Sequence, residues 1–264
     1  VLPCIIISKR QKEHPMFAAS LHQLRRASKL FVPMASKASQ SGFKFDASIA
    51  IPKQNFEYFL VLDFEATCQE GPKIFPQEII EFPVLKVNAQ TLATEATFHK
   101  YVQPRVHKEL TSFCTKLTGI IQEMVDNQPH LEEVLQDFHN WMQQEGLLDQ
   151  STASAFVTCG DWDLNVMLPS QCAHFGIPLP LYMTRWINIK RVFSDVMGRY
   201  PRQDLMEMLR LLNLAHQGRH HSGIDDVRNI ANILGELVIR GAAPSITGEF
   251  RPRPGQFKEQ AGSS

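Results

Sequence analysis

The sequence has no long apolar run, no closely spaced cysteine pair and no excess of charge of either sign. No apolar stretch among its 264 residues approaches the ~18 residues of a membrane-spanning helix, so we expect no contact with a membrane. The five cysteines are scattered and odd in number, without a C-x-x-C pair. This spacing argues against a structural zinc site or a disulfide framework and favours reduced thiols in an intracellular protein.

Net charge is zero, because 27 Lys and Arg balance 27 Asp and Glu. Neutrality alone is only a weak argument against a nucleic-acid partner, although phosphate binders usually have a basic surface. The charge is unevenly spread, however: residues 1–50 carry eight basic and two acidic residues (+6), which leaves 19 basic and 25 acidic (−6) for the remainder. A basic, acid-poor leader is typical of a transit peptide or a flexible arm. We expect a protein of the cytoplasm or nucleus, with the mitochondrion left open.

The composition divides the chain into three zones. Residues 1–53 are basic and weakly patterned, and we expect a flexible segment there. Residues 54–240 are densely patterned and predict one folded domain. Residues 241–264 are rich in Gly, Pro, Ser and charge, a composition that predicts a disordered tail.

The middle zone alternates short apolar runs with segments of helical periodicity. Apolar runs predict strands over residues 58–63, 78–88, 91–102 and 155–159. Helical spacing of apolar residues predicts helices over residues 131–144, 164–175, 189–197, 205–212 and 223–240. A run of three strands followed by alternating helices and strands predicts an α/β fold with a mixed sheet.

Two acids follow the first predicted strand. Asp63 and Glu65 are two residues apart, so in an extended chain they project to the same face. Two carboxylates side by side repel each other and lose solvation, and one must take up a proton unless a cation lies between them. On spacing alone, ordinary surface acids at an exposed strand end are an equally good interpretation.

A second pair of acids, Asp161 and Asp163, follows the strand predicted over residues 155–159. Either acid is suited to capping the next helix. In open α/β sheets, however, sites gather just beyond the carboxyl ends of buried strands. The position of the pair therefore favours a functional site over a cap alone.

A third cluster, His220-His221-Ser-Gly-Ile-Asp225-Asp226, opens the last predicted helix. Acids in the first turn of a helix are favoured by its dipole, which accounts for Asp225 or Asp226 without any function. It does not account for two histidines and a glycine directly upstream. A histidine five residues before a helical acid can reach the same cavity from the preceding loop.

Four acids and one histidine together indicate divalent-metal chemistry. Carboxylate oxygens are ligands that Mg²⁺ and Mn²⁺ prefer. Two such ions about 4 Å apart can hold the attacking and leaving oxygens of a phosphoryl displacement. Histidine, which titrates near neutrality, can take the proton from the attacking water.

These residues resemble a known family. Asp63-Phe-Glu65-Ala-Thr67, Trp162-Asp163 and His221-Ser-Gly-Ile-Asp-Asp226 are similar to the three exonuclease motifs of the DEDDh 3′→5′ exonucleases. The segment Phe113-Cys-Thr-Lys-Leu-Thr-Gly-Ile120 resembles the Leu-Thr-x-Ile element between the first two motifs. Residues 63–68, 186–190 and 218–226 are most similar to the Eri-type exoribonucleases, and the resemblance covers about residues 54–240.

The resemblance implies a fold and a set of residue roles. The fold is RNase H-like, an α/β fold with a mixed five-stranded sheet flanked by helices. Two Mg²⁺ or Mn²⁺ ions would be held by Asp63, Glu65, Asp163 and Asp226, with Glu65 also counted as catalytic. His221 would be the general base. The residues that would contact the substrate are Ala66, Thr67 and Trp162.

The implied activity is release of nucleoside 5′-monophosphates from single-stranded RNA or RNA 3′ overhangs, by a monomer. A DNA 3′→5′ exonuclease is an alternative, because sugar choice depends on 2′-OH contacts that the sequence does not locate. A non-catalytic module that binds RNA or a protein partner is another, although an intact set of five site residues argues against it.

Two neighbouring patterns compete with the assigned residues. Tyr200-Pro-Arg-Gln-Asp204 fits the Tyr-x-x-x-Asp motif of the sister DEDDy group, but this short pattern arises easily by chance. His220 competes with His221; the family spacing of five residues to the last acid selects His221 and Asp226.

Overall fold

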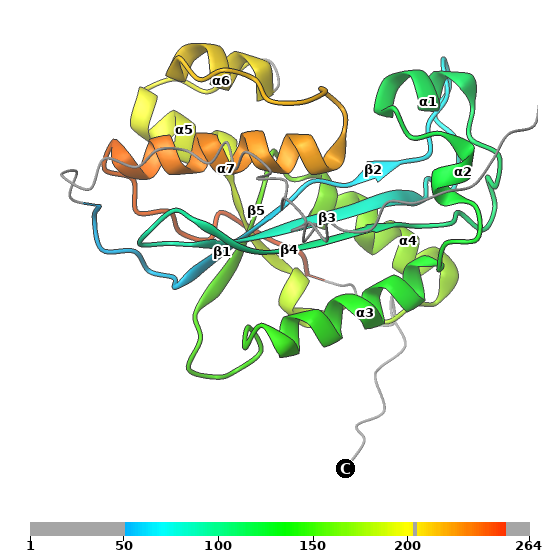
Figure 1. Ribbon diagram of the computed structural model, residues 1–264, viewed down its shortest axis with the longest axis horizontal. Helices are drawn as coiled ribbons and strands as arrows, with labels where there is room; N and C mark the ends of the chain where they lie inside the picture. The colour runs from blue at the N-terminus through cyan, green and yellow to red at the C-terminus, as the bar shows by residue number, and fades with distance from the viewer. Residues whose placement is uncertain (1–50, 203–204, 252–264) are drawn as a thin grey trace, which may run out of the picture. The chain divides into compact units, whose positions relative to one another are not determined.

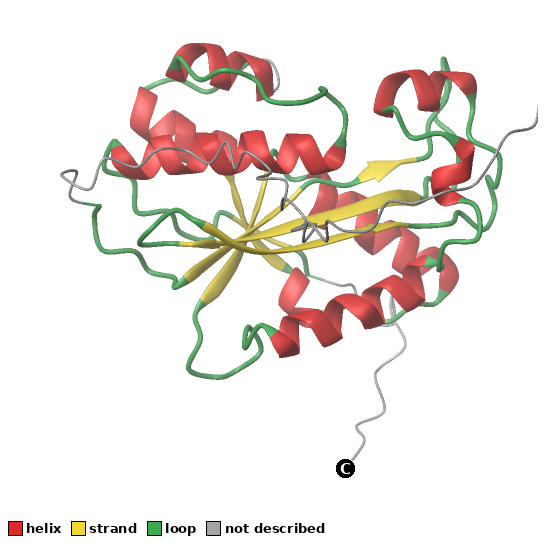
Figure 2. Ribbon diagram, in the orientation of Figure 1, coloured by secondary structure: helices red, strands yellow, loops and turns green. Residues whose placement is uncertain are grey.

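The computed structural model describes residues 51–202 and 205–251. These residues form one mixed β-sheet with helices against both faces (Figures 1 and 2). The flexible segment expected over residues 1–53 lies almost wholly outside the described residues, as do residues 252–264 of the expected tail. No helix in the described ranges is long and apolar enough to cross a membrane.

The sheet of the described ranges contains five strands of four or more residues and two short ones. The longer strands are β1 (Tyr58–Leu62), β3 (Ile79–Asn88), β4 (Thr94–Tyr101), β5 (Ser154–Thr158) and β6 (Arg185–Asn188). The short strands are β2 (Glu65–Ala66) and β7 (Gly248–Glu249). Their order is β2-β3-β1-β5-β6-β7, with β4 paired to β3. The predicted mixed α/β sheet is confirmed, with two dipeptide strands in addition to the five expected.

Strand directions place the carboxyl ends of β1 and β5 side by side in the sheet. β1 pairs antiparallel with β3 and parallel with β5, and β5 pairs parallel with β6. The chain therefore leaves β1 and β5 at neighbouring carboxyl ends. In open α/β sheets this is where functional side chains collect.

The helices agree with the sequence where periodicity is strong. They are α1 (Ser112–Thr118), α2 (Gln122–Val125), α3 (Leu131–Gln144), α4 (Leu168–Phe175), α5 (Ile189–Met197), α6 (Leu205–Leu212) and α7 (Gly223–Ile239). A π-turn, η1 (Asp163–Met167), precedes α4, and a 3₁₀ turn, η2 (Leu181–Met183), precedes β6. The bounds of α3, α5 and α6 match the predicted ranges, whereas α1 and α2 were not predicted.

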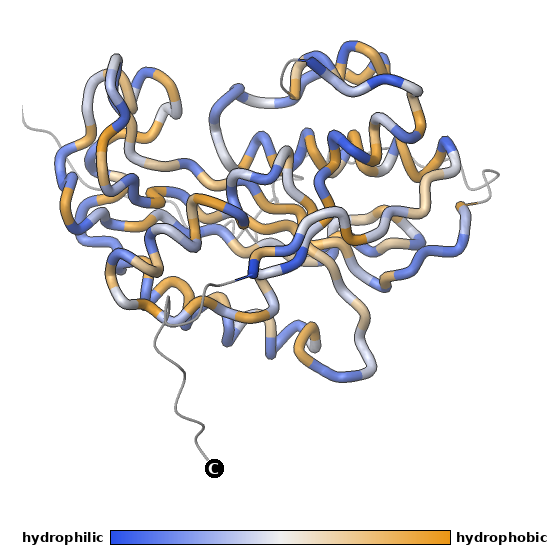
Figure 3. Tube along the Cα trace, turned by 180° about the vertical axis from the view of Figure 1, so that it is seen from behind, coloured by the Kyte–Doolittle hydropathy of each residue, from blue (hydrophilic) through white to orange (hydrophobic). Residues whose placement is uncertain are grey.

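Strand alternation divides the core between the two faces of the sheet. In β1, Leu60 and Leu62 pack with α3 and α4, and Phe59 and Val61 pack with α5, α6 and α7. All four are fully buried, because successive side chains of a strand point to opposite faces. Figure 3 shows apolar residues running through the central strands, whereas the outer loops are mostly hydrophilic.

The carboxyl-terminal segment is part of the fold as far as Arg251. β7 pairs antiparallel with β6, and the Gln54 side chain donates a hydrogen bond to the carbonyl of Ala242 at 3.1 Å. Gly248 lies against the Trp186 indole so closely that a Cβ there would overlap the ring. The folded region thus extends past the predicted boundary at residue 240, because a Gly-rich, polar segment completes the sheet by backbone pairing.

A cluster of aromatic rings between the sheet and α3 allows a test of which residues form the core. Phe82 lies 4.7 Å from Phe64 and 5.0 Å from Phe138, measured between ring centroids. We predict that Phe82→Ala lowers the free energy of unfolding by about 3–5 kcal/mol, because it removes a buried ring and leaves a cavity. Denaturant titration measures this change. Phe75→Ala is the matched control, since Phe75 is 77% exposed, and an equal loss in both variants would contradict the assignment of the core.

Candidate active site

The first two acids lie at a break between β1 and β2. Leu62 pairs with Val84 and Glu65 pairs with Glu81, so the chain resumes the same register along β3 after the break. That register places Pro83 opposite Asp63. Proline has no N–H, so Pro83 donates no backbone hydrogen bond at this point. Asp63 and Glu65 thereby flank a short irregular segment at the carboxyl end of a buried strand.

The third acid reaches the same place from η1. Asp163 follows β5 and is the first residue of the π-turn, where the sequence predicts the start of an ordinary helix. Its Oδ1 accepts a hydrogen bond of 2.9 Å from the backbone N–H of Phe64, the residue between Asp63 and Glu65. This bond fixes the third acid to the segment that carries the first two. Single π-turns within helices are frequent at functional sites.

The fourth acid and the histidine come from the start of α7. Asp226 lies in the first turn, and its Oδ2 accepts a hydrogen bond of 2.9 Å from the backbone N–H of His221. His221 has a left-handed backbone with φ of 62°, which is uncommon for a residue other than glycine. One potential ligand atom from each of Glu65, His221 and Asp226 lies within 4.8 Å of the other two. The predicted acids and histidine are therefore brought together.

The neighbouring residues that competed for these roles have other partners. Asp225 binds the Arg228 guanidinium at 2.8 Å and the backbone N–H of Arg219 at 3.0 Å. Asp161 accepts a hydrogen bond of 2.8 Å from the Trp186 indole. The structure therefore distinguishes Asp226 and Asp163, which lie in the cluster, from Asp225 and Asp161, which are engaged elsewhere. In the DEDDy pattern, Tyr200 is exposed and Asp204 lies outside the described residues.

Burial raises the pKa values of all four clustered acids, and the charges of neighbouring carboxylates raise those of Asp63 and Glu65 further. Burial first, then the charges of Glu81, Asp226 and Asp163, raises the pKa of Glu65 from 4.5 to about 9. Burial also raises the pKa of Asp163 to about 6, although backbone hydrogen bonds oppose the shift. The pKa of Asp63 is raised well above its usual value, by burial and then by the charge of Asp163.

Burial also acts on the fourth acid, Asp226. Burial raises the pKa of Asp226, while His220 and the N–H of His221 act in the opposite direction. Among the described residues, no Lys or Arg forms an ion pair with any of the four acids. Buried carboxylates are normally paired or coordinate a metal. The donor set is made of carboxylate oxygens, so the cluster fits hard divalent cations such as Mg²⁺ or Mn²⁺.

A fifth carboxylate, which the sequence motifs do not predict, belongs to Glu81 of β3, a residue only 1% exposed. Its two oxygens accept hydrogen bonds from the backbone N–H groups of Gly223 at 3.0 Å and Ile224 at 3.2 Å, and one of them lies 2.7 Å from His99 Nε2. Glu81 therefore satisfies orphan donors at the start of α7 and fixes the helix that carries Asp226. In the sequence this residue stands out as an acid between Ile80 and Phe82 within a predicted strand.

Gly223 allows this close approach of α7 to the sheet. A Cβ at this position would lie 3.0 Å from Glu81 Oε2 and 3.1 Å from both the Asp63 carbonyl oxygen and Pro83 Cγ. These separations are tighter than ordinary van der Waals contact. A glycine here thus lets the helix terminus meet the break between β1 and β2.

The three predicted substrate contacts differ in accessibility. Thr67 is 2% exposed, and its hydroxyl accepts a hydrogen bond of 2.9 Å from the backbone N–H of Glu78. Ala66 is buried. Trp162, which precedes Asp163, is 37% exposed and has a ring face suited to base stacking. Contact of these residues with a nucleotide stays a prediction.

The raised pKa values predict a pH dependence of the metal-free protein. Between pH 4.5 and about 9, Glu65 holds its proton in the folded state and loses it in the unfolded state. The folded state then binds more protons, so the free energy of unfolding falls as pH rises through this window. Denaturant titration in EDTA measures the slope, which we expect to be shallower in Glu65→Gln and in wild type with Mn²⁺. Equal slopes in wild type and Glu65→Gln would contradict the account.

Comparison with known proteins agrees with this geometry. A sequence model of the exonuclease family (RNase T type) matches residues 60–234. Human ERI1 exoribonuclease 3 is 56% identical over 200 residues, which cover 76% of this chain and 59% of that protein. The chain thus spans about three fifths of the length of this relative.

Two solved structures share the fold. The nuclease domain of 3′hExo, described as a DEDDh family member bound to rAMP, superposes with a TM-score of 0.72 at 36% identity, covering 75% of this chain and all of that one. A 3′-exonuclease described in 3′-end specific recognition of a histone mRNA stem-loop gives a TM-score of 0.72 at 33% identity, covering 80% of this chain and 72% of that one.

The family match extends over more than half of the chain and contains all four acids and His221. The superposed structures have the same mixed sheet with flanking helices. Divalent-metal dependence is a property of this family, and it agrees with a cluster of buried carboxylates that form no ion pair with a Lys or Arg of the described residues. The chain belongs to the exonuclease family, in its DEDDh branch and among its Eri-type members.

Proposed function

We propose that this chain is a metal-dependent 3′→5′ exoribonuclease, which releases nucleoside 5′-monophosphates from single-stranded RNA ends and 3′ overhangs. The observation that carries the proposal is the convergence of four acids that form no ion pair with a Lys or Arg of the described residues, next to a histidine. Action as a monomer and residence in the cytoplasm or nucleus stay predictions.

The acids are the proposed metal ligands. Asp63, Glu65 and Asp226 would bind two Mg²⁺ or Mn²⁺ ions directly, and Asp163 would complete the second site. Bound divalent cations would offset the charge of the scissile phosphate and stabilise the attacking and leaving oxygens. The protein fixes the positions of two of these ligands, because the carboxylates of Asp163 and Asp226 each accept a backbone hydrogen bond with an N···O distance of 2.9 Å. Preorganised ligands of this kind lower the cost of reaching the transition state.

His221 is the proposed general base. Its backbone N–H is bound to Asp226, and its ring nitrogen lies in the same cluster as the carboxylates of Glu65 and Asp226. A neutral imidazole at this position can accept the proton of the attacking water. The nearby carboxylates then stabilise the imidazolium that forms, and the proton later passes to solvent.

RNA is the proposed substrate because of the relatives. One similar structure is described with rAMP bound and the other with the 3′ end of a histone mRNA stem-loop. A ribonucleoside monophosphate corresponds to the product that removal of a 3′-terminal residue would release. DNA remains the alternative, and Trp162 would serve either polymer, since base stacking on an aromatic ring does not depend on the sugar.

Degradation of labelled RNA tests the activity. With 5′-labelled single-stranded RNA and Mg²⁺ or Mn²⁺, we predict a ladder that shortens from the 3′ end and disappears in EDTA. His221→Ala should slow the reaction by about 10²–10⁴-fold, the usual contribution of a general base. Matched DNA in a parallel reaction distinguishes the two substrates. Activity that is indifferent to EDTA would refute the metal-dependent mechanism.

The adjacent acids 225 and 226 provide a matched pair of variants. Asp226→Asn should abolish cleavage, because it removes a proposed metal ligand. Asp225→Asn should retain most of the activity, because Asp225 binds Arg228 and the loop backbone. Initial rates at saturating Mg²⁺, with melting temperatures to verify folding, measure both. The reverse order of effects would show that the ligand is misassigned.

A further inference from the structure

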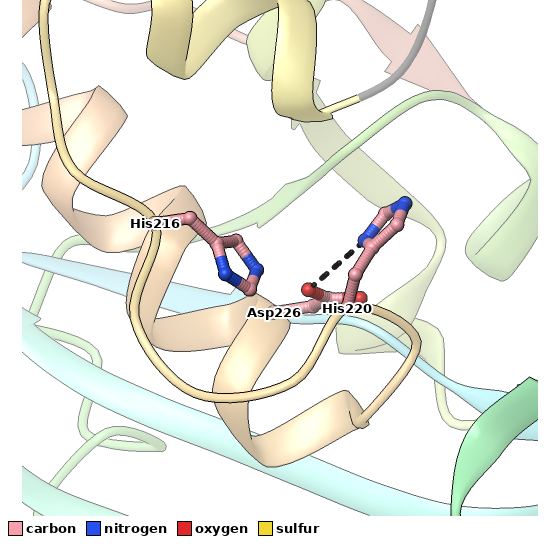
Figure 4. Close-up of side chains that lie close together, drawn as sticks. All are labelled: His216, His220 and Asp226. Carbon is pink, nitrogen blue, oxygen red and sulfur yellow. Dashed lines mark ion pairs between the residues drawn. The ribbon is translucent and has the colours of Figure 1, made fainter.

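We propose that His216, His220 and Asp226 form a second metal site, selective for a transition-metal ion such as Zn²⁺. One donor atom from each residue lies within 4.8 Å of the other two. Figure 4 shows the two histidines reaching from one loop toward the Asp226 carboxylate. His220 Nδ1 is 3.6 Å from Asp226 Oδ1, and the two imidazole rings are nearly perpendicular at 87° with centroids 6.1 Å apart.

The donor set differs in kind from that of the carboxylate cluster. Two imidazoles and one carboxylate suit Zn²⁺, whereas Mg²⁺ prefers oxygen ligands throughout. Three protein ligands and one water form a common tetrahedral zinc site. In a tetrahedral site, donor atoms about 2.0–2.1 Å from the ion lie about 3.4 Å from one another. The three donor atoms here lie within 4.8 Å of one another, so small side-chain rotations would bring them to that separation.

One of the donor atoms, His216 Nε2, is buried and has no hydrogen-bond partner among the described residues. Asp226 Oδ1 is also buried, and its contact with His220 Nδ1 at 3.6 Å is longer than a hydrogen bond. A buried polar atom without such a partner is uncommon and calls for an explanation, and an ion is one of the recognised ones. His216 also lines an open hollow with Leu209 and Asn213.

The loop is held in place between the two histidines. Gln217 N–H donates to Asn229 Oδ1 at 2.9 Å, and Asn229 Nδ2 donates back to the Gln217 carbonyl at 2.8 Å. Arg219 N–H donates to Asp225 Oδ2 at 3.0 Å. Asn229 and Asp225 both belong to α7, the helix that carries Asp226. The three donors are therefore positioned on one framework before any metal binds.

Occupation of this site would inhibit the nuclease, a consequence that rests on the proposed function. Asp226 would be held by the two histidines and would no longer be free to bind the catalytic ions. The His220 ring stacks on His221 with centroids 3.9 Å apart, so the ion would also place positive charge beside the proposed base. Zn²⁺ should therefore inhibit in the presence of excess Mg²⁺.

Metal binding is tested without any nuclease assay. The full chain, treated with EDTA and dialysed, is titrated with Zn²⁺ in competition with a chromophoric chelator, and with Co²⁺ to observe the visible bands of tetrahedral coordination. We expect His216→Asn and His220→Asn to weaken Zn²⁺ binding by at least about 10–100-fold, since loss of an outer-shell partner alone costs that much. His139→Asn, at an exposed histidine on α3, is the control and should bind as wild type does. Equal Zn²⁺ affinity in wild type and His216→Asn would overturn the site.

Inhibition is tested with His216→Asn, which lies outside the proposed catalytic residues. In Mg²⁺ alone it should cleave RNA as wild type does, and it should resist Zn²⁺ concentrations that inhibit wild type. Equal inhibition of both proteins would overturn the regulatory role. If neither protein cleaves RNA or DNA, the proposed function fails, while the Zn²⁺ and Co²⁺ titrations still decide whether the site exists.

Discussion

Mutual repulsion among buried carboxylates is the constraint on which the rest of this structure depends. Asp63 and Glu65, Asp163 and Asp226 come from three different segments of the chain, and the pKa of each acid is raised by burial. Without other contacts, repulsion between the ionised carboxylates would drive these side chains apart. Packing on both faces of the sheet and backbone donors at Phe64 and His221 hold them together. A divalent cation converts this repulsion into attraction, so metal binding and stability are linked.

Glu81 shows how β3 takes part in the site without belonging to the motifs. Its carboxylate binds the first N–H groups of α7 and contacts His99 of β4. The same charge is the largest electrostatic contribution to the raised pKa of Glu65, after burial. Glu81 is therefore a positioning residue: it fixes the helix that presents Asp226 and makes the cluster depend more strongly on cations.

Local patterns in the sequence account for much of the fold and for the chemistry-bearing residues. Strong periodicity predicts α3 and α5 at their observed bounds, and an acid pair after an apolar strand predicts Asp63 and Glu65. Features that depend on distant partners were not predictable. The π-turn at Asp163 accompanies a bond to Phe64, β7 exists because β6 has a free edge, and the role of Glu81 appears only when α7 docks on β3. The left-handed backbone of His221 likewise accompanies a bond to Asp226.

Anomalous scattering from Mn²⁺ would show whether the four clustered acids bind divalent cations. Crystals of the full chain, soaked with Mn²⁺ and a nucleoside 5′-monophosphate, would be measured on the high-energy side of the manganese absorption edge. We expect two anomalous peaks within coordination distance of the carboxylates of Asp63, Glu65, Asp163 and Asp226, with the nucleotide phosphate bound between the ions. Mn²⁺ peaks elsewhere, with these four carboxylates uncoordinated, would contradict it.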